Sequence, residues 1–254
     1  MKFFILSVFL FVTYSTQASK GTLVFFKGKV QIHRSGQPLK VKKKMKLKSG
    51  DIITSGKRSM AIVKSKFATI KVMQKSRILL DFPKNKELDA TIDKGGAVVK
   101  FIRKLKTSNR EKRPEEQVTV RTRTASMGVR GTTFMAFVGK DENSILSVKK
   151  GLVKFQGNAS QKGLEVAKNL STMTNKNSQT ITQKNYGIVN KVNWEMDDMS
   201  KDLFQSNKLF SHLDKVWKNY KHAQEVKWSD YKGTQDKKWK NWSDKQQGFK
   251  GLNN

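Results

Sequence analysis

The sequence predicts a mainly β protein, a sandwich or solenoid-like stack of short strands, followed by a long C-terminal amphipathic α-helix. Between residues 21 and 156, apolar residues alternate with polar ones or form short runs, and turns containing Gly, Asp or Ser separate them. This part has no helical period. From about residue 193, apolar residues recur at helical spacing among Lys, Asp, Asn and Gln, so the chain changes from strands to helix there.

The β part is expected to hold many short strands, which is typical of sandwiches, barrels and stacked repeats. In chain order, strands are predicted at residues 22–26, 29–33, 51–55, 59–65, 68–73, 76–81, 97–102, 118–122, 132–138, 144–148 and 152–156. Residues 106–117 are charged and contain a proline, so they are expected to form an exposed loop. Residues 157–192 are a polar strand or linker segment in which one or two edge strands are expected, at 164–168 and 178–182.

Residues 1–18 have the features of a cleavable signal peptide. Lys2 precedes an apolar stretch from Phe3 to Val12, and Thr16 and Ala18 place small residues where a signal peptidase cuts. The apolar stretch is too short to cross about 30 Å of hydrocarbon, which takes about 20 helical residues. A buried first element and an uncleaved anchor are the alternatives. We therefore expect a periplasmic or secreted β domain at 19–156, before the 157–192 segment and a helical region at 193–254.

The charge of the chain indicates a polyanionic partner. Its 52 Lys and Arg residues against 20 Asp and Glu give a net charge of +32. Residues 191–254 hold 13 basic and 9 acidic residues, a net charge of +4, whereas the rest without Lys2 holds 38 and 11, a net charge of +27. The β part is thus the cationic body. Export disfavours nucleic acid as a partner and favours envelope polyanions such as cell-wall glycans or anionic lipid surfaces.

The sequence gives no sign of catalysis. There is no cysteine, which excludes disulfides, thiolate metal sites and cysteine nucleophiles. His33, His212 and His222 stand in unrelated contexts without metal-ligand spacing. No serine nucleophile elbow or nucleotide fingerprint is present. The prediction is a non-enzyme without catalytic residues, metal ligands or cofactor.

The C-terminal region carries an 11-residue aromatic repeat. The repeat consists of Trp217, Trp228 and Trp239, each followed three residues later by Tyr220, Tyr231 and Trp242, with Gln224, Gln235 and Gln246 in the gaps. On a helix, eleven residues turn only about 20° beyond three full turns, so these side chains share one stripe. A helix over residues 203–249 would be about 70 Å long at about 1.5 Å per residue. Gly233 lies inside it and is a candidate kink.

Three interpretations of the stripe are open at this point. Amphipathic stripes are usually buried, so it can pack on the chain's own β domain or on a second copy. Flat aromatic faces with lysines can instead bind cell-wall glycan. Trp and Lys also suit a helix lying on anionic lipid, although the near-balanced charge of the region counts against that interpretation.

Two stretches of the β part resemble a FecR domain. Residues 28–81 resemble its first half, including Gly50 and Asp51 in a Gly-Asp-x-Ile-x-Thr turn. Residues 118–155 resemble its second half, with the run Gly128-Val129-Arg130-Gly131-Thr132-Thr133-Phe134 and, farther on, Gly151. Well-known members of that family span the inner membrane, carry a cytoplasmic anti-sigma segment and receive a signal in the periplasm. The present sequence departs from that plan, since neither a cytoplasmic segment nor a later membrane helix is recognised.

The Gly128–Phe134 run also has an interpretation that does not depend on the family. Gly128 and Gly131 can adopt positive φ or allow close backbone approach, which predicts a sharp corner between strands. Val129 and Phe134 would then point inward, and Arg130 could satisfy carbonyls. An anion-binding loop is the alternative, but no helix follows to supply its dipole.

The sequence therefore predicts an exported, non-catalytic FecR-like binding or adaptor protein of the cell envelope. Its cationic body would contact an anionic polymer or an acidic protein surface, and the aromatic helix would supply a specific contact or self-association. The alternative is a component of a FecR-type signalling system that acts through a separate membrane partner.

Overall fold

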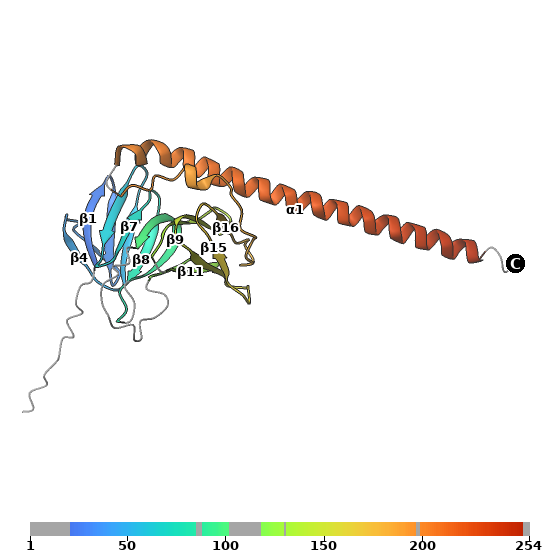
Figure 1. Ribbon diagram of the computed structural model, residues 1–254, viewed down its shortest axis with the longest axis horizontal. Coiled ribbons are helices and arrows are strands. Elements are labelled where there is room, and N and C mark those ends of the chain that lie inside the picture. Colours follow the sequence, from blue (N-terminus) through green and yellow to red (C-terminus); the bar gives the residue numbers. More distant parts are fainter. Residues whose placement is uncertain (1–20, 85–87, 102–117, 130, 197–198, 251–254) are drawn as a thin grey trace, which may run out of the picture.

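The computed structural model of the chain describes residues 21–84, 88–101, 118–129, 131–196 and 199–250 (Figure 1). The predicted signal peptide, the whole of the loop predicted at 106–117, and Arg130 lie outside the described residues. A β body and one long helix make up the described structure, which confirms the predicted fold class. The elements are β1 (Gly21–Lys27), β2 (Val30–Arg34), β3 (Gln37–Leu39), β4 (Met45–Leu47), β5 (Asp51–Ser55), β6 (Met60–Lys64), β7 (Ala68–Val72), β8 (Arg77–Asp81), β9 (Leu88–Phe101), β10 (Val118–Arg121), β11 (Ala125–Val129), β12 (Thr133–Val138), β13 (Ser144–Lys150), β14 (Val153–Gly157), β15 (Leu164–Val166), β16 (Ser171–Met173), the short 3-10 helix η1 (Ile188–Asn190) and α1 (Met199–Lys250).

The strands form one hydrogen-bonded mixed sheet that folds into two layers. The first layer has the order β4-β1-β6-β7-β9-β12-β13-β16. The second has the order β3-β2-β5-β8-β9-β10-β11-β14-β15. All of these pairs are antiparallel except β9 with β10.

Strand β9 belongs to both layers and joins them. Its first half pairs with β8 and β10, and its second half, from Gly95 on, pairs with β7 and β12. Gly95 has a φ of 73°, and a Cβ there would lie 2.3 Å from the Oγ of Ser76. Only glycine fits this change of direction, because any side chain would be strained and would also clash.

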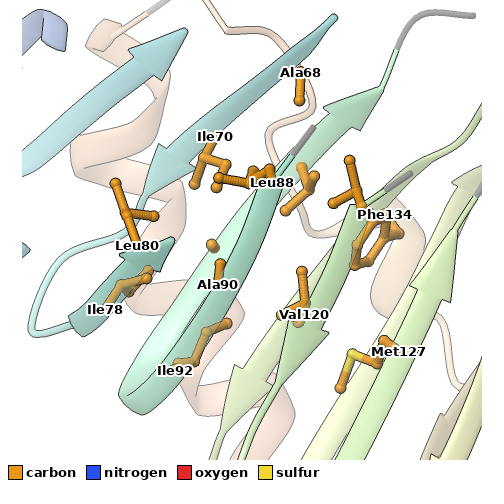
Figure 2. Close-up of a cluster of buried hydrophobic side chains, with 14 of the residues drawn as sticks. Ala68, Ile70, Ile78, Leu80, Leu88, Ala90, Ile92, Val120, Met127 and Phe134 are labelled. Carbon is orange, nitrogen blue, oxygen red and sulfur yellow. The ribbon is translucent and has the colours of Figure 1, made fainter. Parts of the chain in front are cut away.

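The main core lies between the two layers. Alternate residues of the facing strands point into it, as the period of a β-strand requires. Figure 2 shows side chains from β7, β8, β9, β10, β11 and β12 converging there, among them Ile70, Leu80, Leu88, Val120 and Phe134. These five side chains are at most 1% exposed.

A second apolar cluster covers the outer face of the first layer. There Val98 of β9, Met135 of β12, Ile145 of β13 and Met173 of β16 meet side chains of η1 and α1. The part of the first layer that lies under η1 and α1 is therefore buried on both faces. This explains why residues 134–138 form an uninterrupted apolar run rather than an alternating one.

The structure adds elements that the sequence analysis did not predict. Strands β3, β4, β11 and β16 and the first half of β9 were not expected. Of the one or two edge strands expected within 157–192, the one at 164–168 is present as β15, whereas 178–182 forms only an isolated bridge between Thr174 and Thr180. The helix predicted at 203–249 is confirmed as α1, and it continues through Gly233 without interruption.

Candidate functional site

The first part of α1 lies on the first layer, and the rest projects beyond the body (Figure 1). Leu209, Leu213, Val216 and Trp217 are at most 9% exposed and pack in the second cluster. The ring of Phe210 lies 5.3 Å from the ring of Phe137 in β12. The helix is thus held over about three turns and is not a free appendage along its whole length.

The segment that leads into α1 is fixed by a buried lysine. Lys71 of β7 is 2% exposed and points away from the main core. Its Nζ donates to the carbonyl oxygens of Asn193 at 2.8 Å and Glu195 at 2.7 Å. Nearby, the indole of Trp194 donates to the carbonyl of Val189 at 2.8 Å. These bonds hold residues 193–195 against β7, because a buried ammonium group requires such partners.

A carboxylate at the tip of the β12–β13 hairpin makes the most specific contact between body and helix. Asp141 Oδ2 accepts a hydrogen bond from Trp217 Nε1 at 2.6 Å and another from Lys221 Nζ at 2.8 Å. Lys221 and then Trp217 hold the pKa of Asp141 below its usual value. On the same hairpin, Lys140 pairs with Asp214 of α1 at 3.3 Å.

A cavity of about 100 Å³ lies between this hairpin and the helix. The amide of Asn143 lines it, is 1% exposed, and has no hydrogen-bond partner among the described residues. One water molecule needs about 10–15 Å³ of the volume open to a water-sized sphere, so the cavity has room for several that could hydrogen-bond the amide. The junction between helix and body is therefore partly polar.

The outer part of α1 displays the remaining aromatic side chains of the repeat to solvent. Trp228, Tyr231, Trp239 and Trp242 are 62%, 55%, 67% and 57% exposed. The rings of Trp228 and Tyr231 stack at 5.7 Å and 22°, and those of Trp239 and Trp242 meet edge to face at 5.9 Å. A contiguous exposed aromatic surface of this kind marks an interaction site more often than chance exposure. We call the surface formed by these four residues the exposed stripe.

The aromatic repeat is therefore divided into a docked part and an exposed part. Trp217 is buried and Tyr220 is partly buried against the body, and their rings stack at 5.5 Å and 21°. All six predicted aromatic residues lie on one helix, as expected. The sequence could not indicate how far along the helix the body reaches.

The predicted glycine corner lies in the body, away from the helix. Gly131 and Gly151 have φ of 72° and 85°, and a Cβ on Gly151 would lie 2.7 Å from Thr132 Cγ2. Gly128 lies within β11, paired with β10 and β14. Phe134 is fully buried in the main core. The role predicted for Arg130 falls outside the described residues.

Gly50 and Asp51 form a structural turn before β5. Gly50 has a φ of 85°, and Asp51 is fully buried. Both carboxylate oxygens of Asp51 accept from the Arg34 guanidinium at 2.7 Å, and Oδ2 also accepts from the backbone N–H of Lys48 at 2.9 Å. The ion pair raises the pKa of Arg34, chiefly through the hydrogen bond to Asp51. Gly50 and Asp51 thus fasten β5 to its neighbours.

Sequence reasoning missed the residues that join helix and body. Asp141 was recognised only as part of a turn, because its partners lie 76 and 80 residues away. A signal was nonetheless present: Lys221 and Lys232 recur at the same 11-residue spacing as the tryptophans.

A cluster of exposed lysines lies beside β4 at the edge of the body. Its members are Lys40, Lys42, Lys43, Lys44 and Lys46. Figure 1 places β4 at the opposite end of the body from the side where α1 projects. The chain therefore presents a basic edge and an aromatic arm at separate places.

Two negative findings hold for the residues that the structure describes. Among them, no helix combines the length and apolar character needed to span a bilayer. The same residues contain no group of three or more His, Cys, Asp or Glu side chains placed to hold a metal ion.

Part of the β body matches a known protein family. Residues 50–154 match the family model described as FecR protein. Two crystal structures of a "putative anti-sigma factor" from Parabacteroides distasonis ATCC 8503, at 2.50 and 1.65 Å resolution, are similar to the chain. In both, the similarity covers 53% of this chain and 59% of that one, at 20% identity and a TM-score of 0.43. The chain thus spans about three fifths of those structures, and comparison with curated proteins finds no match.

Proposed function

We propose that this chain, which contains a FecR domain at residues 50–154, is an exported, non-catalytic binding protein of the cell envelope. In this proposal the FecR domain is a rigid body, α1 is an arm that carries the specific contact, and the basic body adds attraction to anionic envelope material. Secretion to the periplasm or beyond follows from the signal-peptide features of residues 1–18.

The observation that carries the proposal is the exposed stripe. Trp228, Tyr231, Trp239 and Trp242 are each more than half exposed on a helix that is anchored to the body at its other end. Exposed aromatic side chains are energetically unfavourable in isolation and are enriched where proteins bind partners. Anchoring through Lys71 and the second cluster gives the arm a defined direction, which lowers the entropy cost of binding.

The lysine cluster supports the electrostatic part of the proposal. Its five exposed lysines lie within seven residues, 40–46, and the sequence outside residues 191–254, without Lys2, carries a net charge of +27. Such a field raises the encounter rate with polyanions, and salt screens it over about 8–10 Å. Salt should therefore weaken overall retention without removing the contribution of the aromatic arm.

The test is retention of purified protein on isolated envelope fractions. A variant with Trp228→Ala, Trp239→Ala and Trp242→Ala should lose most retention at high salt, while Trp217 keeps the helix docked. Val226→Ala is the matched control, because Val226 is 45% exposed and lies about 180° around the helix from the stripe. Equal retention of the triple variant and wild type at every salt concentration would contradict the proposal.

Fractionation tests the proposed location. Intact-mass measurement of the envelope-associated protein should give an N-terminus near Ser19. Full-length, unprocessed protein found only in the cytosol would contradict export. Crosslinking in cells separates an adhesive role from the signalling alternative, since a membrane-bound sigma regulator captured through the arm would favour signalling.

A further inference from the structure

The 11-residue repeat places the same residue types at a docked position of α1 and again at an exposed position farther along the helix. Residues 217–221 read WKNYK, residues 228–232 read WSDYK and residues 239–243 read WKNWS. The first two units share Trp, Tyr and Lys at positions 1, 4 and 5. The third keeps two aromatic residues but has Ser243 in place of the lysine.

The first unit shows what this arrangement binds. The indole N–H of Trp217 and the ammonium of Lys221 converge on one oxygen of Asp141, at 2.6 and 2.8 Å. The carboxylate stands at a hairpin tip, and Phe137 and Ile145 of the same hairpin pack in the apolar cluster with the helix. One helical unit therefore recognises an acidic turn together with the apolar strand face beside it.

The second unit already has the geometry of the first. Trp228 and Tyr231 stack at 5.7 Å and 22°, against 5.5 Å and 21° for Trp217 and Tyr220. Lys232 follows one residue after the tyrosine, as Lys221 does, and is exposed. Within the described residues, neither the Trp228 indole nor Lys232 makes a hydrogen bond or ion pair, so both donors are available to a partner.

We infer that Trp228, Tyr231 and Lys232 form a second carboxylate clamp, which binds an acidic turn on a partner protein as Trp217 and Lys221 bind Asp141. This inference rests on the proposed binding function and names the chemistry of its partner. The third unit lies about 16 Å farther along the helix, at about 1.5 Å per residue, and adds apolar contact without an ammonium group.

Acidic residues on the helix and the existing contacts of Asp141 favour a different protein as the partner. They count against a second copy of the chain, a lipid surface and a glycan. In a second copy of the chain, the equivalent hairpin carboxylate is already held by its own Trp217 and Lys221. Glu225 and Asp236 lie on the helix within about 100° of the stripe and oppose an anionic lipid surface. Trp228 and Tyr231 stack on each other, so each has one ring face less for a sugar.

The test uses the full-length protein and a peptide of the chain's own hairpin. The peptide spans residues 137–145, FVGKDENSI, and is closed into a ring by a disulfide between added terminal cysteines. The five tryptophan indole N–H signals of ¹⁵N-labelled protein are followed during titration, with Trp228→Phe assigning the Trp228 signal. Circular dichroism and backbone amide shifts establish that the cyclic peptide forms the hairpin.

The expected result is a saturable shift of the Trp228 signal. A peptide with Asp141→Asn should bind about tenfold more weakly, whereas Glu142→Gln should bind as well as the parent. In the protein, Lys232→Ala should weaken binding about tenfold, and Lys237→Ala, an equal loss of charge about 200° around the helix from Trp217, should have little effect.

Several outcomes would overturn the inference. One is an unchanged Trp228 signal in the presence of a folded hairpin peptide, and another is equal binding by the Asp141→Asn peptide. A third is a Trp228 shift produced by protein concentration alone, which would assign the surface to self-association. A Trp228 shift with polygalacturonate or with phosphatidylglycerol vesicles but not with the peptide would assign it to glycan or lipid. If retention on envelope fractions still required the stripe in any of these cases, the proposed function would stand and only the clamp would fail.

Discussion

Truncating two equivalent tryptophans should have very different effects, because one is docked and the other is not. Trp217 is 9% exposed and Trp228 is 62% exposed, although both occupy position 1 of their repeat unit. A buried tryptophan removes about 150–250 Å² from water, worth about 4–6 kcal/mol at about 25 cal/mol per Å². Trp217→Ala should therefore destabilise helix docking by about 3–5 kcal/mol. Trp228→Ala should change stability by less than about 0.5 kcal/mol.

The destabilisation caused by Trp217→Ala should affect the docking of the helix more than the stability of the β body. The cluster under α1 is separate from the main core, so the helix can detach while the body stays folded. Hydrogen exchange measured by mass spectrometry should show peptides from 207–221 exchanging about 10²- to 10³-fold faster in Trp217→Ala. Peptides from β8 and β10 should be unchanged. Equal exchange in the Trp217 and Trp228 variants would refute the division of the stripe into docked and exposed parts.

Three more predictions follow from particular contacts. Gly151→Ala should destabilise the body by about 2 kcal/mol or more, measured by urea denaturation, because φ is 85° and a Cβ would lie 2.7 Å from Thr132. Gly50→Ala is its control, with the same φ but no atom within 4 Å of the added Cβ, so only the strain of about 1 kcal/mol remains. The lowered pKa of Asp141 means that its contact stabilises docking above the usual carboxyl pKa of about 4 and is lost as pH falls through the folded value. The protection of the helix amides, taken relative to their intrinsic exchange rate at each pH, should therefore fall as the pH is lowered below about 4. Gly233→Ala should raise the thermal stability of the arm, seen as helical circular dichroism, by about 1 kcal/mol, because open space surrounds its Cβ position.

Each of these predictions has a contradicting result. Equal losses for Gly151→Ala and Gly50→Ala would show that the contact with Thr132 has no cost. A loss of protection in acid that persists unchanged in Asp141→Asn would assign the pH dependence to another group. A loss of helicity in Gly233→Ala would indicate that the arm needs a bend at that residue.

Much of the fold could be predicted because its signals are local. Turn residues and period-two patterns mark β5, β6 and β8, and the hendecad spacing of the tryptophans marks α1. The strands that were missed have weak local signals. Strands β3, β4 and β16 are three residues long, and β11 contains Gly128, which suggested a corner although its backbone is paired on both sides. The first half of β9 is different, because buried Leu88, Ala90 and Ile92 alternate with Asp89, Thr91 and Asp93, a period-two signal that the sequence analysis overlooked.

The sequence predicted that the aromatic side chains share one face of a helix, but not which of them are exposed. The repeat placed six aromatic side chains on one stripe, and the structure agrees. Which of them are covered depends on contacts between distant segments, such as Asp141 with Trp217 and Lys71 with the residues before the helix. No local pattern encodes these pairings. The outer face of the first layer, which receives the helix, becomes visible only once the sheet is folded.

The most direct test of a docked helix with a projecting aromatic arm is a distance measurement between spin labels. The chain has no cysteine, so Lys140→Cys and Asn241→Cys give two unique labels, one on the hairpin and one near the end of the arm. Lys140 contacts Asp214, and residue 241 lies 27 residues farther along the helix, about 40 Å at about 1.5 Å per residue. Pulsed electron paramagnetic resonance should give one narrow distribution near about 40 Å. A distribution centred below about 25 Å, or one spread over the whole range, would contradict an extended arm.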